Sequence, residues 1–185
     1  MKRRPLWALP ALLLAVLALA PGAAAQEALP APPPTRPADV ASLDAILAAV
    51  YDVISGPAGR ERDWDRFRSL FVPGARLIPT GRDADGNVRH RVLTPDEYIA
   101  SSGPFLLERG FFEAEIGRAV ERYGPVVHLM SAYESRFRED DREPFQRGVN
   151  SFQLLDDGTR WWVVSIFWSA ETPDNPIPAR LLERR

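Results

Sequence analysis

The sequence predicts an α+β domain in which a strongly curved, mostly antiparallel sheet wraps around about three helices. The order of the expected elements is the first reason: two helices, a strand pair, a third helix, and then four long strands in succession. The second reason is segment 160–171, which is apolar on both faces and therefore belongs in the middle of a sheet. Because a sheet curled around helices encloses a tapered space, we expect a cone with an internal pocket.

Three features of the first 25 residues predict a secretory signal peptide. A basic start at Met1–Arg4 precedes an apolar stretch at Leu6–Ala20, and the small residues Ala23–Ala25 then provide a cleavage site. An uncleaved membrane anchor is the alternative, but the apolar stretch is short for a membrane span and contains a proline. We therefore expect cleavage after Ala25 and a periplasmic or secreted protein.

The remaining chain divides into three expected parts. Residues 26–37 are rich in proline and predict an extended linker, residues 38–173 hold the folded domain, and residues 174–185 form a C-terminal tail. Without the signal peptide, 20 basic residues (23 less the three at its start) stand against 25 acidic ones, a net charge near −5. This balance disfavours nucleic acid and, once the signal is cleaved, membrane as partners. The chain has no cysteine, so no disulfide supports the core.

The helices and strands are predicted from periodicity and from the residues that end each element. Asp63 can cap a helix, Thr94 and Glu97 form a capping box, and Gly103-Pro104 is expected to break the helix that starts there. The expected helices are residues 39–55, 63–71 and 94–102, with a last turn at 105–108. The expected strands are residues 75–80, 88–93, 111–122, 125–138, 145–156 and 160–171.

Strict alternation along the last strand assigns its large side chains to two faces. One face would carry Trp162, Val164, Ile166 and Trp168, and the other Trp161, Val163 and Phe167. We expect one face to bound the cone and the other to meet a second subunit.

Several short patterns make the sequence resemble the nuclear transport factor 2-like superfamily, the cone-shaped fold shared with ketosteroid isomerases and polyketide cyclases. The resemblance covers roughly residues 38–171 and is closest to exported bacterial members without an assigned reaction. The residues that carry it are Asp63-Trp64, Phe67, Leu70-Phe71, Pro73, Ala75-Arg76-Leu77, Gly124-Pro125-Val126-Val127-His128, Tyr133-Glu134-Ser135-Arg136, Arg147-Gly148-Val149-Asn150-Ser151, Trp161-Trp162-Val163-Val164 and Trp168.

The resemblance implies the fold but does not select a function, because this superfamily includes isomerases, dehydratases, epoxide hydrolases, cyclases and non-catalytic binding proteins. Neither the Tyr and two Asp residues of ketosteroid isomerases nor the Asp–Arg–Asp set of the epoxide hydrolases maps onto this chain. No catalytic residue is therefore transferred from the family.

The candidate site residues come from polar and aromatic side chains inside apolar strands. Histidine is the residue type most often used as a base near neutral pH, so His128 is the candidate base, with Glu134 as its candidate partner. The alternative is a structural histidine and a salt bridge at the rim. The expected ligand-binding residues are Trp64, Tyr98, His128, Asn150 and Trp168, although each aromatic residue is also compatible with a plain core position.

No metal or cofactor is expected. The two histidines lack the spacing of a zinc site, and the acidic loop at 83–87 lacks the closing Glu of a calcium loop. Three functions stay open: an exported domain that binds a small apolar molecule, a cofactor-free acid–base enzyme (isomerase, dehydratase or hydrolase) that uses His128, and a homodimeric assembly module.

Overall fold

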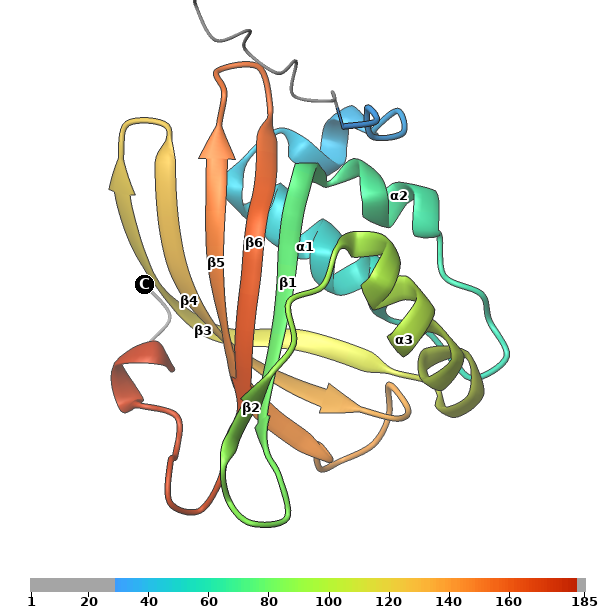
Figure 1. Ribbon diagram of the computed structural model, residues 1–185, viewed down its shortest axis with the longest axis vertical. Coiled ribbons are helices and arrows are strands. Elements are labelled where there is room, and N and C mark those ends of the chain that lie inside the picture. The colour runs from blue at the N-terminus through green and yellow to red at the C-terminus, as the bar shows by residue number, and fades with distance from the viewer. Residues whose placement is uncertain (1–28, 183–185) are drawn as a thin grey trace, which may run out of the picture.

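The computed structural model describes residues 29–182, in which one six-stranded sheet curls around the helices (Figure 1). The strand order is β2-β1-β6-β5-β4-β3, and every pair is antiparallel except β1 with β6. This confirms the predicted α+β class and the curved, mostly antiparallel sheet. The strands are β1 (Phe71–Arg82), β2 (Val88–His90), β3 (Phe112–Tyr123), β4 (Val126–Arg136), β5 (Gln146–Asp156) and β6 (Trp161–Ala170).

The predicted signal peptide and the first residues of the linker lie outside the described residues. No helix between residues 29 and 182 combines the length and the apolar character that a membrane crossing needs.

Three α-helices cover the concave face of the sheet (Figure 1). They are α1 (Leu43–Ile54), α2 (Trp64–Ser69) and α3 (Pro95–Arg109), with short 3₁₀ turns η1 (Pro37–Val40) and η2 (Ala179–Leu181) near the two ends. Asp63 caps α2 by accepting a hydrogen bond from the Arg66 amide, and Thr94 and Glu97 form the expected capping box of α3. The core lies between these helices and the sheet, where Phe67, Leu129 and Phe152 are almost completely buried.

Several element boundaries differ from the sequence prediction, and those of α3 and β1 have a clear physical reason. Helix α3 continues through Pro104 to Arg109, although a break was expected there. Proline removes one hydrogen bond from a helix. The turn after Pro104 is nevertheless stabilised by tertiary contacts, because the Leu106 side chain is buried and the Leu106 carbonyl accepts a hydrogen bond from Arg62. Strand β1 begins at Phe71 instead of residue 75, because Phe71 pairs with Val163 of β6.

A β-bulge in β6 changes which side chains face the cone. Gln153 pairs with Ser165 and Leu154 with Val163, so Val164 is the extra residue. The alternation predicted for this strand is therefore wrong beyond Val164. Trp161, Val163, Ile166 and Trp168 all face inward, whereas Trp162 and Phe167 face outward. As predicted, β6 is central, between β1 and β5.

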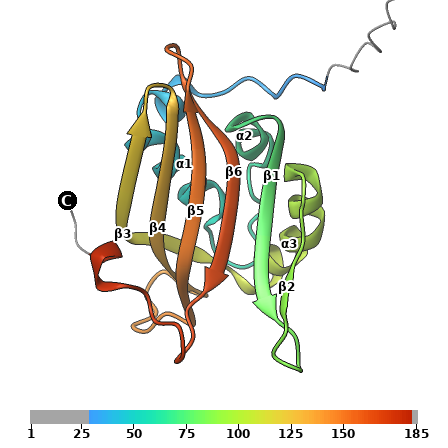
Figure 2. The same cartoon turned by 60° about the vertical axis from the view of Figure 1, so that its left-hand side comes forward.

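The C-terminal residues 174–182, expected to form a tail, pack against the outer face of the sheet (Figure 2). We call this segment the C-terminal strap. Ile177 and Leu181 are buried against Ala132, and the Ile177 amide donates to Glu171 over 2.8 Å. The close approach requires a glycine at position 117, since a Cβ there would collide with the Leu181 carbonyl.

Candidate functional site

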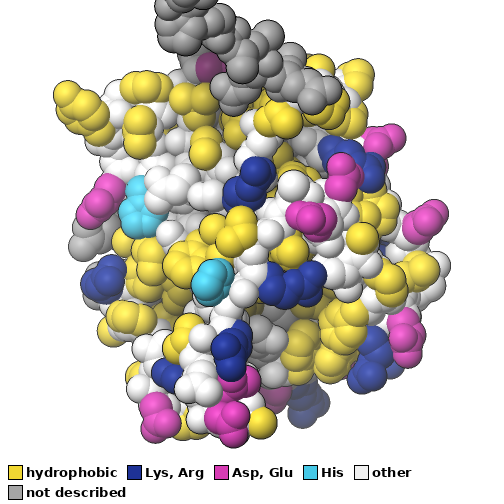
Figure 3. Space-filling model, in the orientation of Figure 1, with side chains coloured by type: hydrophobic (Ala, Val, Ile, Leu, Met, Phe, Trp, Pro, Cys, Tyr) yellow, Lys and Arg dark blue, Asp and Glu magenta, His cyan; other side chains and the backbone are white. Residues whose placement is uncertain are grey.

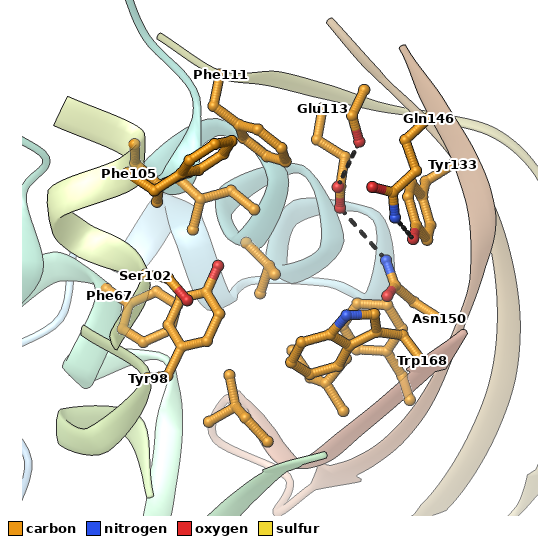
Figure 4. Close-up of a pocket in the computed structure, with 17 residues that line it drawn as sticks. Phe67, Tyr98, Ser102, Phe105, Phe111, Glu113, Tyr133, Gln146, Asn150 and Trp168 are labelled. Carbon is orange, nitrogen blue, oxygen red and sulfur yellow. Dashed lines mark hydrogen bonds between the residues drawn. The ribbon is translucent and has the colours of Figure 1, made fainter. Parts of the chain in front are cut away.

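A cavity of about 310 Å³ lies between α3 and the inner face of the sheet (Figure 4). This is at the small end of ligand pockets, which range over roughly 300–1,000 Å³. Phe105 stands at its rim with 45% of its surface exposed. The apolar and aromatic lining consists of Val50, Ile54, Phe67, Leu77, Tyr98, Phe105, Leu106, Phe111, Tyr133, Phe152, Ile166 and Trp168.

Glu113 is the carboxyl group of this cavity. It enters from β3, and its direct partner across the strands is Ser135 of β4. The Ser135 hydroxyl donates to Glu113 Oε2 over 2.9 Å, and Asn150 Nδ2 donates to Oε1 over 3.4 Å (Figure 4). Loss of solvent around the carboxyl raises its pKa to about 7, and these two hydrogen bonds offset only part of the rise. Glu113 therefore changes charge within the physiological range.

Asn150 connects Glu113 to a second carboxyl group through a buried chain of hydrogen bonds. Its Nδ2 also donates to Tyr51 Oη (3.1 Å), which lies 2.6 Å from Ser131 Oγ. Ser131 donates to Glu115 Oε1 over 2.6 Å, and Arg118 neutralises Glu115 at 2.7 Å. Two carboxyl groups on one strand thus have different surroundings: Glu115 is paired with an arginine, and Glu113 is not.

The remaining polar groups of the cavity are neutral. Burial raises the pKa of Tyr133 to about 12 and also raises that of Tyr98, with the Glu113 charge adding to both. Tyr133 accepts a hydrogen bond from Gln146 over 3.2 Å, and the Tyr98 hydroxyl points into the cavity near Ser102 (Figure 4). At neutral pH these phenols are protonated and can donate to an acceptor on a ligand.

The structure brings three of the predicted ligand-binding residues to the cavity: Tyr98, Asn150 and Trp168 all line it. Trp64 does not. Its ring packs edge-on against Phe67 at a centroid distance of 5.8 Å and lies beside Gly103 of α3, outside the cavity lining.

The placement of His128 and Glu134 in the pocket is wrong. The inward positions of β4 are Leu129, Ser131, Tyr133 and Ser135, so alternation turns their neighbours outward. His128 Nε2 lies 3.1 Å from Ser151 Oγ on this outer face, and Glu134 pairs with Arg136 at 2.6 Å. Figure 3 shows His side chains at the molecular surface. Acid–base chemistry based on His128 in the cone is therefore excluded.

Sequence reasoning missed Glu113, although a signal was present. Phe111, Glu113 and Glu115 alternate at the start of a predicted strand whose apolar residues imply an inward face. Two acidic residues on that face are unusual, because a buried carboxylate needs a partner. Residue pairing across β3 and β4, which the sequence does not contain, was needed to identify the inward face.

The element order and the curved sheet agree with the cone-shaped fold that the resemblance to the nuclear transport factor 2-like superfamily implied. Three solved structures are similar to this chain, each at 16% sequence identity. One is an NTF2-like protein of unknown function from Shewanella baltica (TM-score 0.42; 69% of this chain and 89% of that one). Another is the CaMKII hub of S. rosetta (0.43; 69% and 90%). The third is a candidate ketosteroid isomerase from Kribbella flavida (0.41; 81% and 94%).

Neither a protein-family pattern nor a curated protein matches the sequence. At these identities and TM-scores the likeness carries no argument about function, which has to be argued from the residues.

Proposed function

We propose that the cone binds a small, largely apolar ligand and holds one polar group of it against Glu113. The supporting observation is the distribution of side chains in the cavity. Aromatic and aliphatic residues form most of its walls, whereas Glu113, Tyr133, Gln146 and Asn150 converge at one end (Figure 4). An apolar pocket with a few convergent polar groups is typical of small-molecule sites.

A large side chain introduced on α3, where it would fill the cavity, tests this proposal. Ser102 lines the cavity, whereas its neighbour Ser101 is exposed and lies outside the lining. We expect Ser102→Trp to weaken uptake of the neutral dye N-phenylnaphthylamine by roughly tenfold or more, because the indole occupies the ligand volume. Ser101→Trp is the matched control and should bind as the parent does. Equal dye fluorescence with Ser102→Trp and the parent protein would refute binding in the cone.

Glu113 also supports a second candidate, an acid–base enzyme in which this carboxyl replaces His128 as the proton acceptor. A general base works best when its pKa lies near the working pH, and that of Glu113 is raised to about 7. Native mass spectrometry of the protein from its own source separates the two candidates. A retained molecule that is recovered unchanged after renewed incubation with the protein favours binding. Its conversion to a product, including an isomer of equal mass detected by NMR, favours catalysis.

The same spectra bear on export. The signal-peptide pattern of residues 1–25 supports secretion or a periplasmic location, and a processed chain would begin at Gln26. An intact mass that includes Met1–Ala25 would contradict this proposal.

We further propose that the outer sheet face forms a homodimer. Phe167 of β6 and Val126 of β4 face outward with about half of their surface exposed (48% and 56%), and Val164 at the bulge is also exposed. Exposed apolar patches of this kind favour association. Phe167→Asp should shift the protein to a monomer in light scattering, whereas Leu107→Asp, an exposed leucine on α3, should not. A parent protein that is monomeric at high concentration would refute the dimer.

A further inference from the structure

The charge balance of the cavity is unusual for this chain. Of the 17 residues that line it, Glu113 is the only one with a carboxyl group, and none is Arg, Lys or His. Other partly buried carboxylates have an arginine: Asp39 pairs with Arg66 at 2.7 Å, and Glu115 with Arg118. Within residues 29–182 Glu113 forms no ion pair, and its partners Ser135 and Asn150 are neutral. The carboxyl group therefore lacks a positive partner.

Charges outside the cavity do not supply that partner. A polar cleft on the other side of Glu113, between α1 and β3, contains arginines. Arg118 pairs with Asp44 and Glu115, and Arg136 pairs with Glu134. Arg60, the third arginine of this cleft, is exposed and forms no ion pair with Glu113, and no arginine in the described part of the chain lowers the pKa of that carboxyl. The titratable groups that face Glu113 from the packed elements are Tyr51 of α1, Tyr98 of α3, Tyr133 of β4 and Glu115 of its own strand. None of them is cationic, so the surroundings favour a positive charge brought by a ligand.

Aromatic rings surround the space in front of this carboxyl group. Tyr98, Phe111, Tyr133 and Trp168 are drawn around it in Figure 4, and Phe67, Phe105 and Phe152 complete the lining. The faces of aromatic rings attract cations, most strongly where water is excluded. One carboxylate without an ion-pair partner, among aromatic side chains, is a combination suited to an ammonium group.

We propose that the cone selects an organic cation, an amine with a mostly apolar body, whose ammonium group pairs with Glu113 while its body packs among the aromatic rings. This inference rests on the proposed binding function and names its ligand class. It also excludes small carboxylic acids and phosphates, since their charge would lie beside an unneutralised carboxylate.

Binding of such an amine should depend on pH in a defined direction. The carboxyl has a pKa of about 7 in the empty cavity and must be ionised to pair with the ammonium group. Below that pH, binding has to remove the proton, so affinity falls by up to roughly tenfold per pH unit. A simple alkylamine, with a pKa near ~10, stays charged throughout this range.

Three ligands with one body and different ends test the inference: phenylbutylamine, phenylbutanol and phenylbutanoate, measured by calorimetry at pH 8. We expect the amine to bind roughly tenfold or more tightly than the alcohol, and the carboxylate to bind most weakly. Between pH 8 and 5.5 the amine should weaken by roughly tenfold or more, while the alcohol should stay constant.

Two variants make the result specific. Glu113→Gln should remove the preference, so that this variant binds the amine and the alcohol with about equal affinity. Glu134→Gln, a carboxyl group on the outer face of the sheet, should keep the preference of the parent protein. If the alcohol binds as well as the amine, or if the preference persists in Glu113→Gln, the amine inference is wrong and the binding proposal stands. If none of the three ligands binds while N-phenylnaphthylamine does, only the amine inference is wrong. If neither the ligands nor the dye binds, both are wrong.

Discussion

Glu113→Gln is expected to make the protein more stable at pH 8, by about 2–3 kcal/mol in the free energy of unfolding. In the folded protein the pKa of Glu113 is raised from its ordinary value of 4.5 to about 7. Between these two values the folded state binds more protons than the unfolded state, so stability falls as pH rises through this window. Glutamine keeps the shape of the protonated acid but cannot ionise.

Urea titrations of the parent and variant at pH 4.5 and pH 8 measure this effect. The two proteins should have similar stability at pH 4.5 and diverge as the pH rises. If the free energies of unfolding of the two proteins differ by the same amount at pH 4.5 and at pH 8, the pKa of Glu113 is not raised on folding. The carboxyl group would then be paired or well solvated. A higher free energy of unfolding in Glu113→Gln would show that the ionised Glu113 destabilises the fold, as groups in functional sites often do.

Arg62→Met is expected to destabilise the fold by about 3 kcal/mol or more. The Arg62 side chain has only 7% relative exposure, and its guanidinium donates to the backbone carbonyls of Ile54 (2.9 Å), Gly56 (2.6 Å) and Leu106 (3.1 Å). It therefore joins the end of α1 to the second half of α3, which lines the cavity. Methionine fills a similar volume but leaves these carbonyl groups without donors.

Thermal unfolding compares this change with Arg68→Met. Arg68 forms more exposed ion pairs with Asp65 and Asp96, and such pairs contribute roughly 0–1 kcal/mol. Arg62→Lys should fall between the two, because one ammonium group cannot reach all the acceptors. Equal melting temperatures for Arg62→Met and Arg68→Met would show that the buried guanidinium is dispensable.

Most of the fold could be predicted because its elements carry local signals. The capping box at Thr94 and Glu97 marks the start of α3, and the two apolar faces of residues 160–171 place that strand in the centre of the sheet. The end of α3 could not be predicted in the same way. A proline at position 104 argues for a break, and the contacts that keep the helix intact come from Arg62, 42 positions earlier in the chain.

The candidate site was predicted less well because it depends on which face of each strand points inward. Ile166 and Trp168 were expected on the same face of the strand as Trp162. The extra residue Val164 places them on the opposite face. The sequence pattern of β4, the strand that contains His128, does not show which of its two faces points inward. The burial of Leu129 and Tyr133 shows that the inward face is theirs. Face assignment therefore needs the pairing of strands, which is a long-range property.

The C-terminal strap has a consequence for how such a protein can diversify. It covers the sheet around Ala132 and leaves Phe167 and Val126 exposed, while the cavity lies on the opposite side of the same strands. Changes in the length or sequence of the strap would alter how much outer surface a neighbouring copy can reach without touching Glu113. The proposed dimer surface and the proposed ligand site thus lie on opposite faces of the sheet, so mutations on one face can leave the other unchanged.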